Sequence, residues 1–156
     1  MSKNPDDISF EIINSENKLI FLVGVIKDFT AYNFATDYNY SYLDFNSFLI
    51  ENKIDSQHFK KDDALRTTRI NISIDHWTQK VTYREQKGTI IIDGFDPLKI
   101  PDLLTRSLLM QELLHLSRNS AKLKTHLVFV IDLKNGALEE QILPKILANG
   151  HIINVD

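Results

Sequence analysis

The stretch Thr89 to Leu98, T-I-I-I-D-G-F-D-P-L, constrains the fold of this chain more than any other. Three consecutive isoleucines with no polar residue between them predict a β-strand that is covered on both faces. Strands of this kind belong to parallel sheets flanked by helices. Asp93 then stands at the carboxyl end of the strand, where open α/β sheets gather their ligands. Asp93 is therefore the first candidate functional residue.

Other segments repeat this pattern. Leu19–Val23 is an apolar run that ends at Gly24, and Leu127–Ile131 is another that ends at Asp132. Two more strands are predicted at Tyr40–Phe45 and His151–Val155. Five buried strands that alternate with helices predict an α/β fold, a three-layer sandwich with a mostly parallel sheet and right-handed crossovers. No repeat or linker divides the chain, so residues 1–156 are predicted to form one domain.

Helices are predicted between the strands. Asn4-Pro5-Asp6-Asp7 predicts a helix start, because it combines a cap residue, a proline at the first position and two acids, although Ile8, Phe10 and Ile12 alternate as in a strand. The longest predicted helix is Asp102–Ser117, with a broad apolar face that includes Leu109, Leu113 and Leu116. The remaining predicted helices are Thr30–Ala35, one from Asn46 or Ser47, one around Ile74 to Val81, and one from Ala137 to Asn149-Gly150 that is strained or broken at Pro144.

Composition limits the class of protein. The 156 residues are 43% hydrophobic and 25% charged, as in ordinary soluble globular proteins. A net charge of −3 argues against a surface built to bind phosphate backbones, so nucleic acid is not indicated as a partner. The chain has no cysteine and no signal-like start, which predicts a cytoplasmic location. Its apolar runs fall short of the roughly 20 residues that a membrane span needs, so no span is expected.

The order of these features resembles the core of an AAA or RecA-like P-loop NTPase. Gly24 follows the first strand, as in a phosphate loop, Asp93 ends a Walker B-like strand, and Asp132 ends the strand that would carry the sensor. The layout is also similar to the BrxF family of BREX phage-exclusion operons. The resemblance implies the sheet order 5-1-4-3-2. It also implies vestigial nucleotide-binding positions at Gly24, Lys27, Thr30, Asp93 and Asp132.

The loop after the first strand departs from a working phosphate loop, which reads G-x-x-x-x-G-K-[ST]. Gly24 to Thr30 contains no second glycine, and the β-branched residues Val25 and Ile26 resist the conformations of such a cradle. Lys27 and Thr30 are not adjacent, and Asp28 would repel phosphates. In addition, Gly94 stands where the acid that orients the attacking water would follow Asp93. We therefore expect no catalytic residues.

Other groupings of polar residues have plainer explanations. Asp93 and Asp96 could hold a divalent cation, but an Asp-Gly-x-Asp-Pro turn that caps its own backbone is commoner, so no metal is expected. Glu112 and His115 on the long helix read as a polar surface strip. No serine lies in a G-x-S-x-G elbow. The aromatic residues between the first and third strands either pack in the core or form a contact surface; they are Tyr32, Phe34, Tyr38, Tyr40 and Tyr42.

Two functions agree with these features. The first is a non-catalytic subunit with a P-loop fold, a protein-binding assembly or regulatory module without a cofactor, whose partner is an active NTPase or further copies of the chain. The alternative is a divergent nucleotide-binding NTPase that uses ATP and Mg through Lys27, Thr30 and Asp93, completed by a partner subunit. An unrelated Rossmann-like topology is a third possibility, because fold does not fix function.

Overall fold

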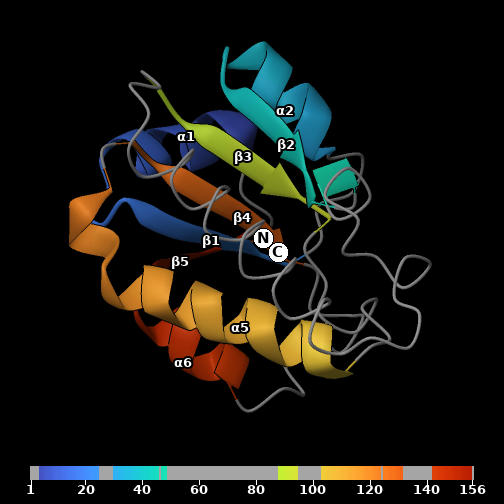
Figure 1. Cartoon of the computed structure of the whole chain (residues 1–156). Helices are drawn as coiled ribbons and strands as arrows, with labels where there is room; N and C mark the ends of the chain where they lie inside the picture. The colour runs from blue at the N-terminus through green and yellow to red at the C-terminus, as the bar shows by residue number, and fades with distance from the viewer. Residues whose placement is uncertain are drawn as a thin grey trace.

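The computed structural model describes residues 4–24, 30–45, 47–48, 88–94, 103–123, 125–131 and 142–155 (Figure 1). Its strands form one parallel sheet in the order β2-β3-β4-β1-β5. The strands are β1 (Leu19–Val23), β2 (Ser41–Asp44), β3 (Ile90–Asp93), β4 (Leu127–Ile131) and β5 (His151–Asn154). Helices flank both faces of the sheet. The predicted α/β sandwich and its strand order are confirmed.

The middle of the sheet is formed by the apolar runs. All five residues of β1 are buried, as are the three isoleucines of β3. Leu19 pairs with Leu127 and Val23 with Ile131, so β1 and β4 run in register over their full length. Successive side chains of a strand point to opposite faces, and these strands therefore supply apolar groups to both helical layers. This is why their sequences lack polar alternation.

One face of the sheet is covered by α1 (Pro5–Ile13) and α2 (Ala31–Asp37). The side chain of Asn4 accepts a hydrogen bond from the backbone N–H of Asp7 at 2.9 Å, and Pro5 occupies the first turn. The cap predicted from the sequence is thus confirmed, and the strand alternative for this segment is wrong. Ile8 and Ile12 lie one turn apart and are fully buried against the sheet.

The other face is covered by α5 (Leu103–Arg118) and α6 (Ile142–Ala148). Met110, Leu113 and Leu116 are buried against the sheet, which confirms the apolar face predicted for the long helix. A short 3-10 turn, Ser120–Lys122, then leads toward β4. Pro144 is the third residue of α6 and does not break it within the described range.

The sequence predicted that all five strands are buried, and this is wrong for two of them. The residues of β2 are exposed or half-buried, and β5 alternates, with Ile153 buried and Ile152 42% exposed. The reason is their position, because β2 and β5 form the two edges of the sheet and each pairs with only one neighbour. Apolar content alone does not distinguish an edge strand from a central one.

Several predicted features lie outside the described residues. These are the segment 55–69, the helix around Ile74 to Val81, the turn at Lys134 to Gly136 and the start of the helix at Ala137. Of the helix predicted from Asn46 or Ser47, the structure describes Ser47 and Phe48, and Phe48 packs in the core beside Phe45. Among the helices of the described ranges, none has the length and apolar content needed to traverse a lipid bilayer.

Candidate functional site

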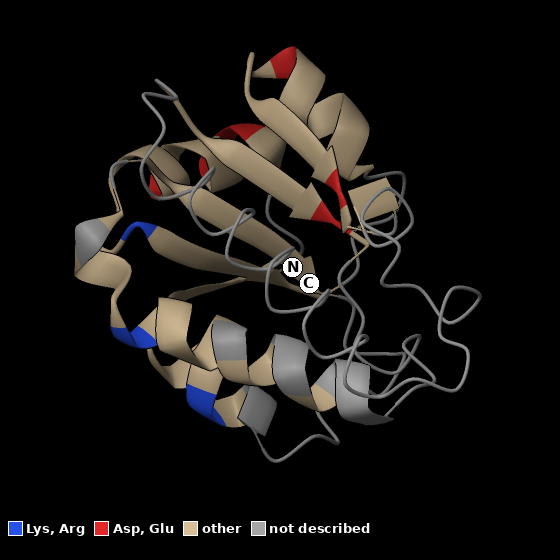
Figure 2. Cartoon of the chain, viewed as in Figure 1, with Lys and Arg blue, Asp and Glu red and all other residues tan. Residues whose placement is uncertain are grey.

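Two carboxylates stand side by side at the carboxyl edge of the sheet. Asp44 is the last residue of β2 and Asp93 the last residue of β3, and they are direct partners in the parallel register. Figure 2 shows the acidic colour at the ends of these two strands. The structure therefore confirms that Asp93 ends a buried strand, and it adds Asp44 from the neighbouring strand.

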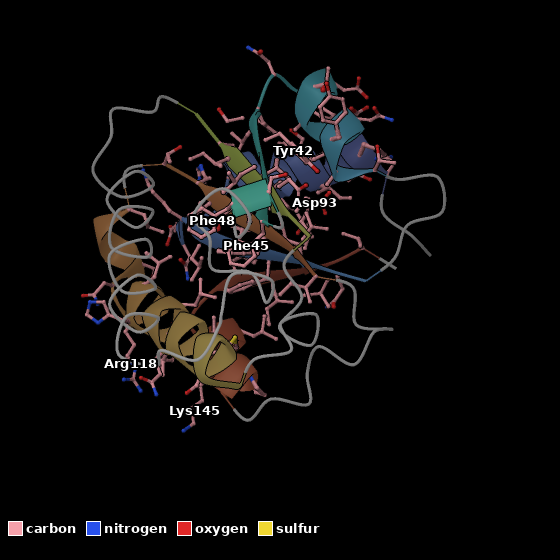
Figure 3. All side chains as sticks on the ribbon, turned by 45° about the vertical axis from the view of Figure 1, so that its right-hand side comes forward. Tyr42, Phe45, Phe48, Asp93, Arg118 and Lys145 are labelled. Carbon is pink, nitrogen blue, oxygen red and sulfur yellow. The ribbon has the colours of Figure 1, made fainter. Side chains whose placement is uncertain are left out.

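The carboxylate of Asp93 is engaged at both oxygens. The Tyr42 hydroxyl donates a hydrogen bond to Oδ2 at 2.7 Å, and the backbone N–H of Gly94 donates to Oδ1 at 2.9 Å. Tyr42 pairs in register with Ile91, so its bond to Asp93 runs diagonally between adjacent strands. Figure 3 shows Tyr42 and Asp93 next to each other above the sheet. The Gly94 contact follows from the turn, because Gly94 adopts a positive φ of 72° that glycine reaches without strain.

The environment of Tyr42 favours its neutral form. Burial raises the pKa of Tyr42, and the hydrogen bond and negative charge of Asp93 raise it further, with a smaller contribution from Asp44. The ring of Tyr42 also meets the ring of Tyr32 from α2 edge to face, with centroids 5.3 Å apart. Tyr42 is therefore a fixed hydrogen-bond donor to Asp93 at neutral pH.

Asp44 has a local partner of its own. The hydroxyl of Ser47 donates a hydrogen bond to Asp44 Oδ2 at 3.1 Å. Tyr42 and Asp44 are two residues apart in one strand and so point to the same face of the sheet, the face covered by α1 and α2. The edge thus combines two carboxylates with two partly exposed tyrosines, Tyr32 and Tyr42. Such a surface can accept hydrogen bonds and pack against a cation or an aromatic group.

The structure describes two of the positions that the sequence resemblance assigns to a phosphate loop, Gly24 and Thr30. Gly24 has a φ of 119°, and its N–H donates to the carbonyl of Ile131 at 3.1 Å, so the chain leaves β1 still attached to β4. Thr30 is the N-cap of α2, and its hydroxyl oxygen accepts a hydrogen bond from the N–H of Asn33 at 3.2 Å. Lys27 and Asp132 lie outside the described residues, as does Asp96. The structure therefore assigns a capping role to Thr30.

The described histidines lie away from this edge. His126 donates through Nε2 to the carbonyl of Ser15 at 3.1 Å, and His151 Nδ1 lies 2.7 Å from the Ser15 hydroxyl. Both bonds hold the turn between α1 and β1. This turn lies at the amino ends of the strands, whereas Asp93 lies at a carboxyl end. His115 is exposed on α5. Over the ranges that the structure describes, no three histidine, aspartate or glutamate side chains gather as metal ligands.

Sequence reasoning missed the contact between Tyr42 and Asp93. Tyr42 was assigned to a group of aromatic residues whose members either pack in the core or form a contact surface. The structure divides that group, because Phe34 is buried, Tyr38 and Tyr40 are half-buried, and Tyr32 and Tyr42 are exposed. A signal was available in the spacing of Tyr42 and Asp44, which predicts that both point to one face near the end of a strand.

No family model, curated protein or solved structure matches this chain. The resemblance to P-loop NTPases therefore remains a prediction that rests on the sequence pattern.

Proposed function

We propose that this chain is a cytoplasmic, non-catalytic subunit with a P-loop-like fold that acts as a protein-binding assembly or regulatory module. The observation that carries the proposal is the hydrogen bonding of Asp93. In a working P-loop enzyme, the acid at this position holds magnesium, together with a hydroxyl from the phosphate loop. Here one oxygen of Asp93 accepts from the neutral Tyr42 hydroxyl and the other from the Gly94 N–H.

The phosphate-loop positions support the same conclusion. The hydroxyl oxygen of Thr30 serves as a helix cap, and the sequence from Gly24 to Thr30 lacks the second glycine that a phosphate cradle needs. Gly94, which follows Asp93, has no side chain to orient an attacking water. These features favour binding of a partner over turnover of a nucleotide.

Exposed apolar side chains support protein binding. Phe10 is 69% exposed and Ile13 is 60% exposed, and both lie on the outer surface of α1. They are three residues apart and therefore neighbours on the helix. Phe10 and Ile13 are both in contact with water. Removal of their apolar surface from water by a partner protein is therefore favourable.

A second candidate function is a divergent nucleotide-binding NTPase that uses ATP and Mg through Lys27, Thr30 and Asp93, with a partner subunit completing the site. What favours it is the backbone of Gly24. Its φ of 119°, directly after β1, matches the need of a phosphate loop for glycine at this turn.

Nucleotide binding separates the two functions. A nucleotide that binds only the folded state stabilises it by about 2.7 kcal/mol at a hundredfold excess over Kd. We expect millimolar ATP or GTP with magnesium to leave the thermal unfolding midpoint unchanged and to release no phosphate. Tyr42→Phe is the control variant, because it removes the hydrogen bond to one oxygen of Asp93 and keeps the aromatic ring.

The opposite result has a clear form. A nucleotide-dependent rise in the midpoint that Lys27→Ala or Asp93→Ala abolishes would support the second function. Protein binding is measured separately, by affinity capture with the wild-type chain and with Phe10→Ser. A partner protein that the wild type retains and the variant loses is the expected outcome, and equal retention would contradict a binding role for α1.

A further inference from the structure

The described side chains of the two helical layers carry opposite charge. The described acids of the α1/α2 layer are Asp6, Asp7, Glu11 and Asp37, and this layer has no described lysine or arginine. The described charged side chains of the α5/α6 layer are Arg118 and Lys145. Figure 2 shows the acidic colour on the helices above the sheet and the basic colour on those below it. Among the described side chains, charge is therefore separated across the sheet.

The acidic side has an apolar centre. Phe10 and Ile13 are exposed on the outer surface of α1, and the exposed Asp7 lies one turn before Phe10. Asp6 accepts a hydrogen bond from the Tyr38 hydroxyl, which fixes its carboxylate between α1 and α2. An apolar pair bordered by carboxylates suits a partner surface that is apolar at its centre and basic at its rim.

The basic side has a matching arrangement. Pro144, Lys145 and Ala148 are exposed on one side of α6, and Arg118 is exposed at the end of the neighbouring α5 (Figure 3). Pro144 and Ala148 are four residues apart and form a small apolar strip. Neither Arg118 nor Lys145 has an ion-pair partner within the described ranges. This surface therefore presents two cations beside a small apolar strip.

We propose that the outer surface of α1 in one copy docks on the outer surface of α5 and α6 in a second copy. The inference rests on the proposed function, because it names the partner of a protein-binding module. The two surfaces lie on opposite faces of one sheet, so they cannot meet within a single molecule. Their charges are complementary, which selects a second copy as the occupant.

The physical properties of this contact follow from its composition. Exposed ion pairs contribute little to affinity, so burial of Phe10 and Ile13 supplies most of the binding while the charges set the orientation. The interface is heterologous, since different surfaces of the two copies meet, and it repeats into chains or closed rings. Association should increase with protein concentration and weaken with salt, because the Debye length falls from about 10 Å at 0.1 M to about 3 Å at 1 M.

A charge exchange between copies tests the proposal. Asp7→Lys makes the α1 surface basic, and Lys145→Glu makes the α6 surface acidic. Each variant alone would bring like charges together, whereas an equimolar mixture restores opposite charges at every contact. Glu16→Lys is the control, because it makes the same charge change at an exposed position outside α1. The measurement is weight-average mass by sedimentation equilibrium at low and high salt, with circular dichroism to establish folding.

We expect the wild type and Glu16→Lys to exceed the 18.0 kDa monomer mass as concentration rises at low salt, and each charge variant alone to stay near it. The mixture should regain the larger mass, and Phe10→Ser should weaken association by about tenfold or more. A wild type that stays at 18.0 kDa, or a mixture that does not recover, overturns the proposal. The proposed function would survive that result if Phe10→Ser loses a different captured protein, and it fails separately if nucleotide stabilises the chain.

Discussion

The ring of Phe21 occupies the space where a side chain on Gly150 would lie. A methyl group built on Gly150 would be 2.4 Å from Phe21 Cε2 and 3.2 Å from the carbonyl oxygen of Leu19. Gly150 lies in the connection between α6 and β5, so this connection closely approaches the inner strand β1 at this point. Because the crowded neighbours are a packed ring and backbone, we expect Gly150→Ala to lower the free energy of unfolding by about 1–3 kcal/mol in a denaturant titration.

The control for this prediction is a second substitution. Phe21→Leu alone leaves a cavity and is destabilising, but it also removes the aromatic edge that the new methyl group would meet. The double variant should therefore lose less stability than the two single losses together. Strictly additive losses would show that the crowding at Gly150 has another source.

Removal of the Tyr42 hydroxyl should reduce stability modestly. Tyr42→Phe deletes the hydrogen bond to Asp93 while the ring keeps its contact with Tyr32. Bonds to charged groups contribute about 1.5–3 kcal/mol when buried, and the partial exposure of Tyr42 brings the expected loss to about 1 kcal/mol. Urea unfolding measures it, with Tyr32→Phe as the comparison, and an unchanged midpoint for Tyr42→Phe would mean that the bond adds nothing to stability.

Alkaline pH should destabilise the fold through Tyr38. The hydrogen bond from its hydroxyl to Asp6, together with desolvation and nearby acids, raises the pKa of Tyr38 to about 12 from an ordinary value of 10.0. A pKa that is higher in the folded state means that the stabilisation is complete below pH 10 and is lost as pH rises from about 10 to about 12. Titration of phenolate absorbance should show a late-ionising group that is absent in Tyr38→Phe. In Asp6→Asn that group should ionise earlier, and an unchanged titration there would exclude Asp6 as the cause.

An aspartate introduced in a central strand should have a different effect on folding from an aspartate introduced in an edge strand. Ile91 is fully buried in β3, and Ile91→Asp should prevent folding because an unpaired charge costs several kcal/mol against a total stability of about 5–15 kcal/mol. Ile152→Asp is the matched change on the exposed edge strand, and it should leave a cooperative thermal transition. Cooperative folding of the Ile91 variant would contradict the two-sided burial of β3.

The orientation of α5 can be tested in the same way. Leu113 is buried against the sheet and Gln111 is exposed. Leu113→Ala should lower the free energy of unfolding by about 2–5 kcal/mol, whereas Gln111→Ala should change it by less than about 0.5 kcal/mol. Similar effects of the two substitutions in a denaturant titration would contradict the described orientation of the helix.

The sequence predicted the three inner strands well because each is a short apolar run with a clear end. Leu19–Val23 and Leu127–Ile131 have the same bounds in the structure as in the prediction. The edge position of β5 is part of the predicted order 5-1-4-3-2, but the exposure that goes with it was not predicted, because burial of a strand depends on how many neighbours it has. His-Ile-Ile-Asn reads as apolar in either position.

The candidate site was predicted only in part. Asp93 was identified because it interrupts an apolar run, which is a local signal. Its contact with Tyr42 depends on which strands are neighbours and on their register, and these are properties of the folded sheet. The sequence resemblance placed Thr30 among the vestigial nucleotide-binding positions, and that prediction stands untested; the structure adds that Thr30 caps α2.

The strand order has a consequence for synthesis on the ribosome. The strand β1 pairs only with β4 and β5, and its first partner along the chain begins at Leu127. At about 5–20 residues per second, the apolar segment Leu19–Val23 therefore waits on the order of 5–20 s before a pairing strand has been translated. An unpaired apolar strand is prone to aggregation during such an interval. We therefore expect the nascent chain to need β1 shielded from other chains until β4 emerges.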